Sequence, residues 1–308
     1  MDQNYQPYSF YQEEQPVKNA AYYRGEARDA LRGKWPMSVI VYFLFTVLSS
    51  TVATFAMIPI LISMFTMSMN PNAVSPESLL LTMLISMLFV IVISVLVLSP
   101  VTVGLYRIYL DLIDGKTVRF EALFSYFKKG YLSSVTTYLL YSLLIVAGML
   151  PAILTCFVAI VIAELVTQPA LAALLSVMVI LVGVVLSIVL VILLTYRYAL
   201  SFFILAEYPT LSALDVLRNS SVLMKGNKWR LFCLQISFIG WMLLLIPLNF
   251  LTCGIGTLIG QPTVYTYLYT AQAAFYLDVA KRDAANDVEF PSLDPNDYNP
   301  DEDPNRPL

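Results

Sequence analysis

Residues 165–196 read LVTQPALAALLSVMVILVGVVLSIVLVILLTY, a stretch that contains no charged side chain. About 20 consecutive apolar residues in a helix suffice to cross the hydrocarbon core of a bilayer, so this stretch is long enough to span a membrane. Across the 308 residues, 58% are apolar and 13% are charged, which is roughly half of the charge of an average soluble domain. The sequence therefore predicts an all-α, polytopic membrane protein. Four further uncharged stretches have suitable lengths: residues 35–76, 78–106, 130–163 and 231–277.

Turn-forming residues divide the five stretches into six predicted spans. The stretch 231–277 contains Pro247, Pro262 and several glycines near its middle, which favours two helices with a break between them. The predicted membrane domain covers residues 20–282, between an N-terminal tail (1–19) and an acidic C-terminal tail (283–308) whose compositions are typical of disorder. The predicted spans are about residues 37–69, 78–107, 131–163, 170–200, 231–248 and 262–278.

The basic residues all fall on one side of these six spans. The 18 lysines and arginines precede the first span, separate the second from the third and the fourth from the fifth, or follow the sixth. The opposite connections, 70–77, 164–169 and 249–261, contain none. Because cytoplasmic loops carry the excess of Lys and Arg, we expect both termini to lie in the cytoplasm. No apolar signal segment follows Met1, so we expect the first span to direct insertion.

Three segments on the basic side resemble one another. They are residues 20–33, 117–130 and 210–226. Each reads as a short amphipathic helix that ends in a basic residue and a glycine, followed by an aromatic residue that opens a span. A glycine directly after a helix favours the left-handed conformation, and Gly33, Gly130 and Gly226 recur at this place.

The recurrence favours three parallel transmembrane hairpins, each preceded by a cytoplasmic amphipathic helix, around a pseudo-threefold axis. The alternative is coincidence, because glycine caps and interfacial aromatic residues precede many spans for ordinary reasons.

The composition excludes several classes of catalyst. The chain has no histidine, so imidazole bases, histidine metal ligands and histidine triads are absent. Its three cysteines have no CxxC spacing, which favours small buried side chains over a zinc or redox site. Arg107 and Asp111 form the one suggestive catalytic pair, and an intrahelical salt bridge explains them more simply. We therefore expect no enzymatic activity and no cofactor. The net charge of −3 gives no indication of a nucleic-acid partner.

The basic surface is the first candidate site, with anionic membrane lipids as the expected partners. A basic residue near a membrane surface contributes about 1 kcal/mol of attraction to anionic headgroups. Anchoring of the topology explains the same residues without specific lipid binding. The candidate headgroup contacts are Arg32, Lys34, Lys128, Lys129, Lys225, Lys228 and Arg230.

The sixth predicted span carries the second candidate site. Tyr265, Tyr269, Gln272 and Tyr276 share one helical face by their spacing, and Gln235 lies in the fifth span. These side chains are candidates for lining a polar cavity, whereas interhelical hydrogen bonds and an interfacial tyrosine belt are the alternative. No ionisable residue falls in mid-span, which disfavours an ion-coupled pump.

Residues 24–35, RGEARDALRGKW, resemble the opening of a bacterial membrane family known as domain of unknown function 975. Residues 196–207, YRYALSFFILAE, and 224–232, MKGNKWRLF, are more similar still, and the likeness covers about residues 20–280. The resemblance implies a multipass protein of the bacterial cytoplasmic membrane and supplies no activity, substrate or catalytic residue. The chain is also distantly similar to the membrane domain of glycerophosphodiester phosphodiesterases. That similarity hints at lipid-related work, but their catalytic barrel is absent here.

Together these features predict a non-enzymatic membrane protein that binds or moves a lipid or another weakly polar small molecule. The alternative is a structural or regulatory subunit of a membrane complex, with the acidic C-terminal tail as its docking element for a membrane protein partner.

Overall fold

The computed structural model describes residues 18–70, 75–252 and 254–285. All regular secondary structure in these ranges is helical, which confirms the predicted all-α class. Both predicted tails lie mainly outside the described residues.

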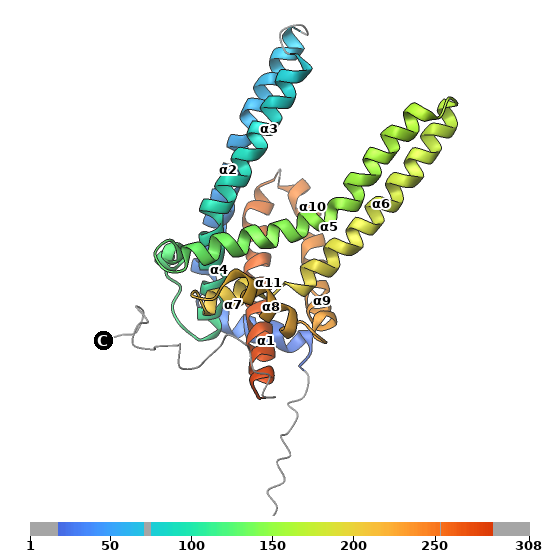
Figure 1. The fold of residues 1–308 in the computed structure, drawn as a ribbon. Coiled ribbons are helices and arrows are strands. Elements are labelled where there is room, and N and C mark those ends of the chain that lie inside the picture. Colours follow the sequence, from blue (N-terminus) through green and yellow to red (C-terminus); the bar gives the residue numbers. More distant parts are fainter. Residues whose placement is uncertain (1–17, 71–74, 253, 286–308) are drawn as a thin grey trace, which may run out of the picture.

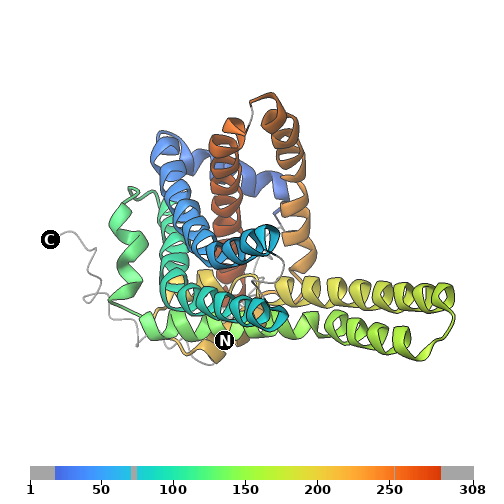
Figure 2. The same ribbon diagram turned by 90° about the horizontal axis from the view of Figure 1, so that it is seen from above.

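Two long helix pairs set the shape of the protein. Helix α2 (Trp35–Met69) packs along α3 (Pro76–Ile93), and α5 (Tyr131–Leu165) packs along α6 (Pro169–Arg197). Figure 1 shows the two pairs as arms that diverge from a common base. Seen from above in Figure 2, the α5/α6 arm extends far beyond the rest of the molecule.

The arms are apolar over nearly their whole surface. At most 17% of the most apolar window in any spanning candidate is buried, and exposed apolar surface of this extent needs a lipid environment. Helix α11 (Ile255–Ala285), which contains the predicted sixth span, is not among these candidates, since its tyrosine, threonine and glutamine side chains lower its hydropathy. Five described segments are long and apolar enough to cross a membrane: Trp35–Met69, Glu77–Ile113, Tyr131–Leu165, Pro169–Glu207 and Lys228–Leu251.

The buried core lies in the base, on the side of the basic residues. There, α1 (Ala20–Leu31), α4 (Ser99–Ile113) and α7 (Ser201–Glu207) contact one another or α11. Helix α8 (Ala213–Leu223) packs against α5 and α7. The largest fully buried side chains include Tyr23, Tyr109, Phe203, Phe275 and Tyr276 on these helices. Phe238, directly before the helix Ile239–Leu251, is also fully buried.

The three similar segments each form a helix followed by a left-handed glycine. Helices α1, η2 (Phe120–Phe127) and α8 occupy them, and Gly33, Gly130 and Gly226 have φ angles of 77°, 74° and 83°. The predicted left-handed conformation is therefore confirmed. The middle helix, η2, is a 3₁₀-helix. The arrangement of three hairpins about a pseudo-threefold axis stays a prediction.

The structure corrects the break predicted within residues 231–277. The predicted spans 231–248 and 262–278 are replaced by α9 (Lys228–Ile236), α10 (Ile239–Leu251) and α11, so the turn lies near Thr252 rather than over residues 249–261.

Close helix packing explains two glycines in this region. A Cβ atom on Gly256 or Gly260 would lie 2.6 Å from a leucine side chain of α10, so these glycines allow α10 and α11 to approach. Pro247 and Pro262 both lie inside helices.

The second predicted span, 78–107, is interrupted by one π-helical turn. The turn η1 (Ser94–Leu98) separates α3 from α4, just before Pro100. Proline has no N–H for the carbonyl four residues earlier, and that carbonyl belongs to Leu96. Tyr131 Oη donates a hydrogen bond of 3.1 Å to it. The interruption thus follows from a proline whose missing bond is replaced by a side chain.

Candidate functional site

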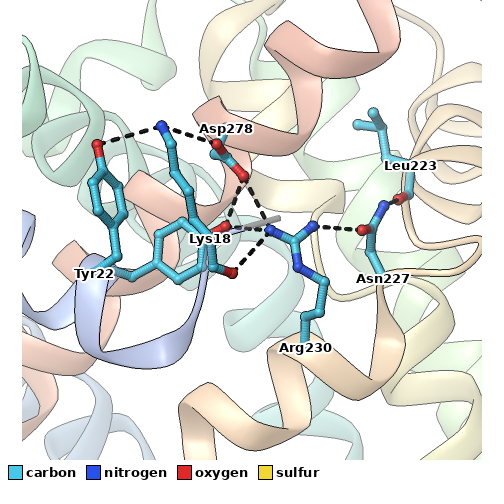
Figure 3. Close-up of polar contacts among 7 residues, drawn as sticks. Lys18, Tyr22, Leu223, Asn227, Arg230 and Asp278 are labelled. Atoms are coloured by element: carbon cyan, nitrogen blue, oxygen red, sulfur yellow. Dashed lines mark hydrogen bonds and ion pairs between the residues drawn. The ribbon is translucent and has the colours of Figure 1, made fainter. Parts of the chain in front are cut away.

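An ionic cluster lies where α1, α9 and α11 meet, and Figure 3 shows its members pointing toward one another. Asp278 forms salt bridges of 3.1 Å with Lys18 Nζ and with Arg230 Nη2. Tyr23 Oη donates a 2.7 Å hydrogen bond to Asp278 Oδ2 and accepts one from Arg230. We name Lys18, Tyr23, Arg230 and Asp278 the Asp278 cluster.

Burial makes the charges of the Asp278 cluster depend on each other. The side chain of Asp278 is 6% exposed and that of Arg230 is 15% exposed, so each charge has lost much of its hydration. For Lys18, burial alone would lower the pKa, but the hydrogen bond and the charge of Asp278 outweigh it and leave the pKa raised. The contacts with Asp278 therefore favour the charged form of Lys18.

Both terminal guanidinium nitrogens of Arg230 bond to other residues of the protein. Its Nη1 donates a 2.7 Å hydrogen bond to Asn227 Oδ1, and Asn227 Nδ2 in turn donates to the Leu223 carbonyl at 2.9 Å (Figure 3). This predicted headgroup contact is thus directed into the junction between α8, α9 and α11. Sequence reasoning did not identify Tyr23 or Asp278 as its partners.

Lys34 is engaged in a similar way. Its Nζ donates hydrogen bonds of 2.7 Å to the carbonyls of Gly115 and Lys116, just after the end of α4. A cation just beyond the C-terminal end of a helix interacts favourably with the helix dipole. Lys34 therefore ties the start of α2 to the end of α4. The other five basic candidates are exposed: Arg32, Lys128, Lys129, Lys225 and Lys228.

A second polar cluster joins α4, η2 and α7. Arg107 Nε lies 3.2 Å from Asp111 Oδ1, which confirms the intrahelical salt bridge. Arg107 Nη1 and Tyr126 Oη both donate to the Ala206 carbonyl, at 3.3 Å and 2.5 Å. Burial raises the pKa of Tyr126, although the charge of Arg107 opposes this shift. We name Arg107, Asp111 and Tyr126 the Arg107 cluster.

The predicted polar face of α11 packs among aromatic rings. The Tyr269 ring lies 5.6 Å from the rings of both Tyr106 and Tyr109 on α4, measured between centroids. The Tyr265 ring stacks on Tyr42 of α2 at 5.7 Å. These five tyrosines form an aromatic cluster between α2, α4 and α11. The spacing of Tyr106 and Tyr109 by three residues was the available sequence signal for their shared face.

The remaining polar candidates lie apart from this cluster. Gln272 is buried, and Tyr276 Oη donates a 2.5 Å hydrogen bond to Glu207 Oε2 at the end of α7. Gln235 Oε1 accepts a 2.6 Å hydrogen bond from Tyr196 Oη, between α9 and α6. The structure therefore places Gln235 in a different contact from the α11 tyrosines. Whether these side chains line a polar cavity stays a prediction.

Within the described ranges, no group of three or more histidine, cysteine or acidic residues could hold a metal ion. The two clusters connect helices through ion pairs and hydrogen bonds. The five other basic candidates are exposed at the surface.

Comparison with known proteins gives one match. The family described as "Protein of unknown function (DUF975)" matches residues 18–283, which takes in nearly all of the described helices. No curated protein and no solved structure matches the chain. The similarity to glycerophosphodiester phosphodiesterases stays a prediction.

Proposed function

We propose, from the premise that this chain belongs to the DUF975 family of proteins of unknown function, that it is a non-enzymatic integral membrane protein that binds anionic lipid headgroups on its basic side. The observation that carries this proposal is the exposure of Arg32, Lys128, Lys129, Lys225 and Lys228 beside the left-handed glycines of the base. Binding a headgroup is also the first step of moving a lipid, the wider expectation from the sequence.

Two features of these five residues support a lipid ligand. They lie at the ends of η2 and α8 and beside the starts of α2, α5 and α9, where apolar helices leave the base. The exposed Trp229 follows Lys228, and Tyr131 lies two residues after Lys129, just beyond the end of η2. Amphipathic aromatic rings favour the headgroup level of a bilayer, so cations and aromatic rings together fit phosphate groups at that level.

Native mass spectrometry of protein gently extracted from membranes tests the proposal. The test variant replaces Arg32, Lys225 and Lys228 by Gln, and we expect it to retain at least several-fold less bound anionic lipid. The matched control replaces the exposed Arg28, Arg218 and Lys281 by Gln, which removes the same charge at other places, and it should retain lipid as the parent does. Equal retention by both variants would contradict the proposal.

The topology that accompanies this function has six spans, with α9–α10 as the fifth and α11 as the sixth. Both termini of the chain then lie in the cytoplasm, on the same side of the membrane as all of its lysines and arginines. The contact between α10 and α11, and the absence of Lys and Arg from the segments linking the paired helices, support this arrangement.

Cysteine labelling with a membrane-impermeant reagent tests the topology in intact cells. In a chain whose native cysteines are replaced by serine, Lys225→Cys should react only after permeabilisation, whereas Gln168→Cys, between α5 and α6, should react from outside. The reverse pattern would show that the orientation is wrong.

A second candidate function is that of a structural or regulatory subunit. The divergent arms in Figure 1 carry exposed apolar side chains around their surface, and another membrane protein can pack against such helices. A second polypeptide present in fixed stoichiometry in the native mass spectrum would favour this function over lipid binding.

A further inference from the structure

The 3₁₀-helix η2 carries exposed aromatic side chains although it lies outside the apolar spans. Phe120, Phe124 and Phe127 are 38%, 53% and 39% exposed. The lysines Lys128 and Lys129 follow directly and are also exposed. Three exposed phenylalanines beside two cations form a strongly amphipathic surface, which we name the η2 face.

The η2 face is held outward by tight docking on α4. A Cβ atom on Gly104 would lie 2.3 Å from the Leu123 carbonyl oxygen, so the backbones of α4 and η2 touch at this glycine. Leu123 and Tyr126 are buried, and the Tyr126 hydroxyl is bonded to the Ala206 carbonyl. The other side of η2 is thus fixed, and the phenylalanines cannot turn inward without breaking this docking.

The chain connects η2 directly to an apolar arm. Gly130 turns the chain with a φ of 74°, and α5 begins at Tyr131. The Phe127 ring lies 6.0 Å from the Tyr131 ring, and Tyr131 Oη bonds to the Leu96 carbonyl of η1. The end of η2 therefore lies at the boundary between the basic base and the apolar helices.

The figures show how η2 is oriented. It is the green turn from which α5 starts, seen almost end-on at the left of Figure 1 and side-on at the left edge of Figure 2. Its axis thus runs across the direction of the α5/α6 arm, and it lies at the periphery of the molecule. A helix with this orientation lies along a membrane surface when the arms cross the membrane.

We propose that η2 is an interfacial helix whose Phe124 and Phe127 insert among the acyl chains of the cytoplasmic leaflet, while Lys128 and Lys129 contact anionic lipid phosphates. This inference rests on the proposed topology and extends the proposed lipid binding to a specific element. An anionic lipid surface fits for two reasons. The η2 face continues into the apolar surface of α5, and its cations complement the phosphates.

Spin-label depth measurements test the position of η2. The label is attached to Phe124→Cys in a chain without native cysteines, reconstituted into vesicles of phosphatidylcholine with or without phosphatidylglycerol. We expect this site to collide more with oxygen, which dissolves in lipid, than with a water-soluble nickel chelate. Val185→Cys on the exposed surface of α6 serves as the lipid reference, and Asp114→Cys after α4 serves as the aqueous reference.

The role of the lysines is tested in the same vesicles. Phosphatidylglycerol should move the label at residue 124 deeper, and the variant Lys128→Gln/Lys129→Gln should lose at least half of that shift. The control Arg28→Gln/Arg218→Gln removes two exposed charges elsewhere and should keep the shift.

Three results would overturn the inference. In the first, the label at residue 124 collides mainly with the water-soluble chelate. In the second, it is shielded from both reagents and shows spin–spin broadening between copies. In the third, its depth is the same with and without phosphatidylglycerol. The first places η2 in water, and the second shows that protein covers the η2 face. These outcomes are separable from failure of the proposed function, because the lipid-retention variant leaves η2 unchanged and cysteine labelling reports the topology by itself.

Discussion

At the scale of single residues, the contacts of a charged side chain decide whether it can serve a ligand. Lys34 and Arg230 look in the sequence like the other basic residues beside the three glycines. In the structure Lys34 binds the carbonyls after α4, and Arg230 binds Asp278, Tyr23 and Asn227. Their cationic groups therefore join helices of the base, and the proposed lipid binding rests on other, exposed cations.

The Asp278 cluster yields a stability prediction. Asp278→Asn removes the charge that compensates Lys18 and Arg230, so we expect a loss of about 3–5 kcal/mol of unfolding free energy, the range for removing one partner of a buried ion pair. The measurement is thermal or denaturant unfolding in a mild detergent. Asp114→Asn is the matched control, since its side chain is 49% exposed and should change stability little. An Asp278 variant as stable as this control would contradict the prediction.

At the scale of elements, proline, serine and glycine shape the α5/α6 arm. Pro151 lies inside α5, and the next backbone N–H, from Ala152, donates a 2.8 Å hydrogen bond to Ser187 of α6. A Cβ atom on Gly183 of α6 would lie only 1.9 Å from Thr155 Oγ1 of α5. Side chains and close contact thus join two helices whose apolar surfaces gain little from association in lipid.

The close contact predicts the effect of substitutions at Gly183. Gly183→Ala should force α5 and α6 apart and cost about 1–3 kcal/mol, as overpacking does in a filled interior. Gly183→Leu should cost more. Gly240→Ala in α10 is the control, because a Cβ atom there meets nothing within 4 Å. The melting temperatures of all three variants are measured in detergent. Equal melting temperatures for Gly183→Ala and Gly240→Ala would show that the close contact between Gly183 and Thr155 is unimportant for stability.

The left-handed glycines make a separate prediction. At Gly33 an added Cβ atom meets nothing within 4 Å, but the φ angle is 77°, so Gly33→Ala should destabilise the protein by about 1 kcal/mol through backbone strain alone. Gly25→Ala, inside α1 and also in open space, should be neutral or stabilising, because alanine favours a helix. The changes in unfolding free energy caused by Gly33→Ala and Gly25→Ala should therefore have opposite signs, or differ by at least the backbone strain of about 1 kcal/mol. The same sign and size for both would exclude backbone strain as the cause.

At the scale of the whole molecule, the arms and the base are stabilised by different means. The arms have few buried residues, and such apolar helices are stable in lipid because their backbone bonds are internal. The base has a packed aromatic core, with the Asp278 cluster and the Arg107 cluster joining its helices. Changes in the aqueous phase should therefore act mainly on the base.

The pH dependence of stability follows from this division. Lys18 and Tyr126 both have raised pKa values, so each holds its proton more tightly in the folded state than in the unfolded chain. The stability that they contribute is complete below about pH 10 and is lost as the pH rises through their folded-state pKa values. We expect the melting temperature in detergent to fall as the pH rises above about 10. The variant Lys18→Met/Tyr126→Phe should show a shallower fall, and an unchanged slope would contradict this assignment.

Much of the fold was predictable because its causes are local. The apolar stretches became helices, and the glycines after α1, η2 and α8 took positive φ angles as expected. The break within residues 231–277 was placed wrongly, because Gly256 and Gly260 serve close packing against α10 rather than a loop. The α11 tyrosines were identified as a group, but their partners Tyr42, Tyr106 and Tyr109 come from other helices and were missed.

The sequence by itself determined that the chain forms long helices suited to a membrane, since an apolar helix satisfies its backbone hydrogen bonds within its own segment. Only the tertiary structure decided which cations are exposed and which are partly buried between helices. Tyr23 and Asp278, which share a hydrogen bond with each other and bind Arg230, are 255 residues apart in the chain. Apolar composition favours a helix over a few turns of chain, whereas the contact between Tyr23 and Asp278 forms only where packing brings distant helices together.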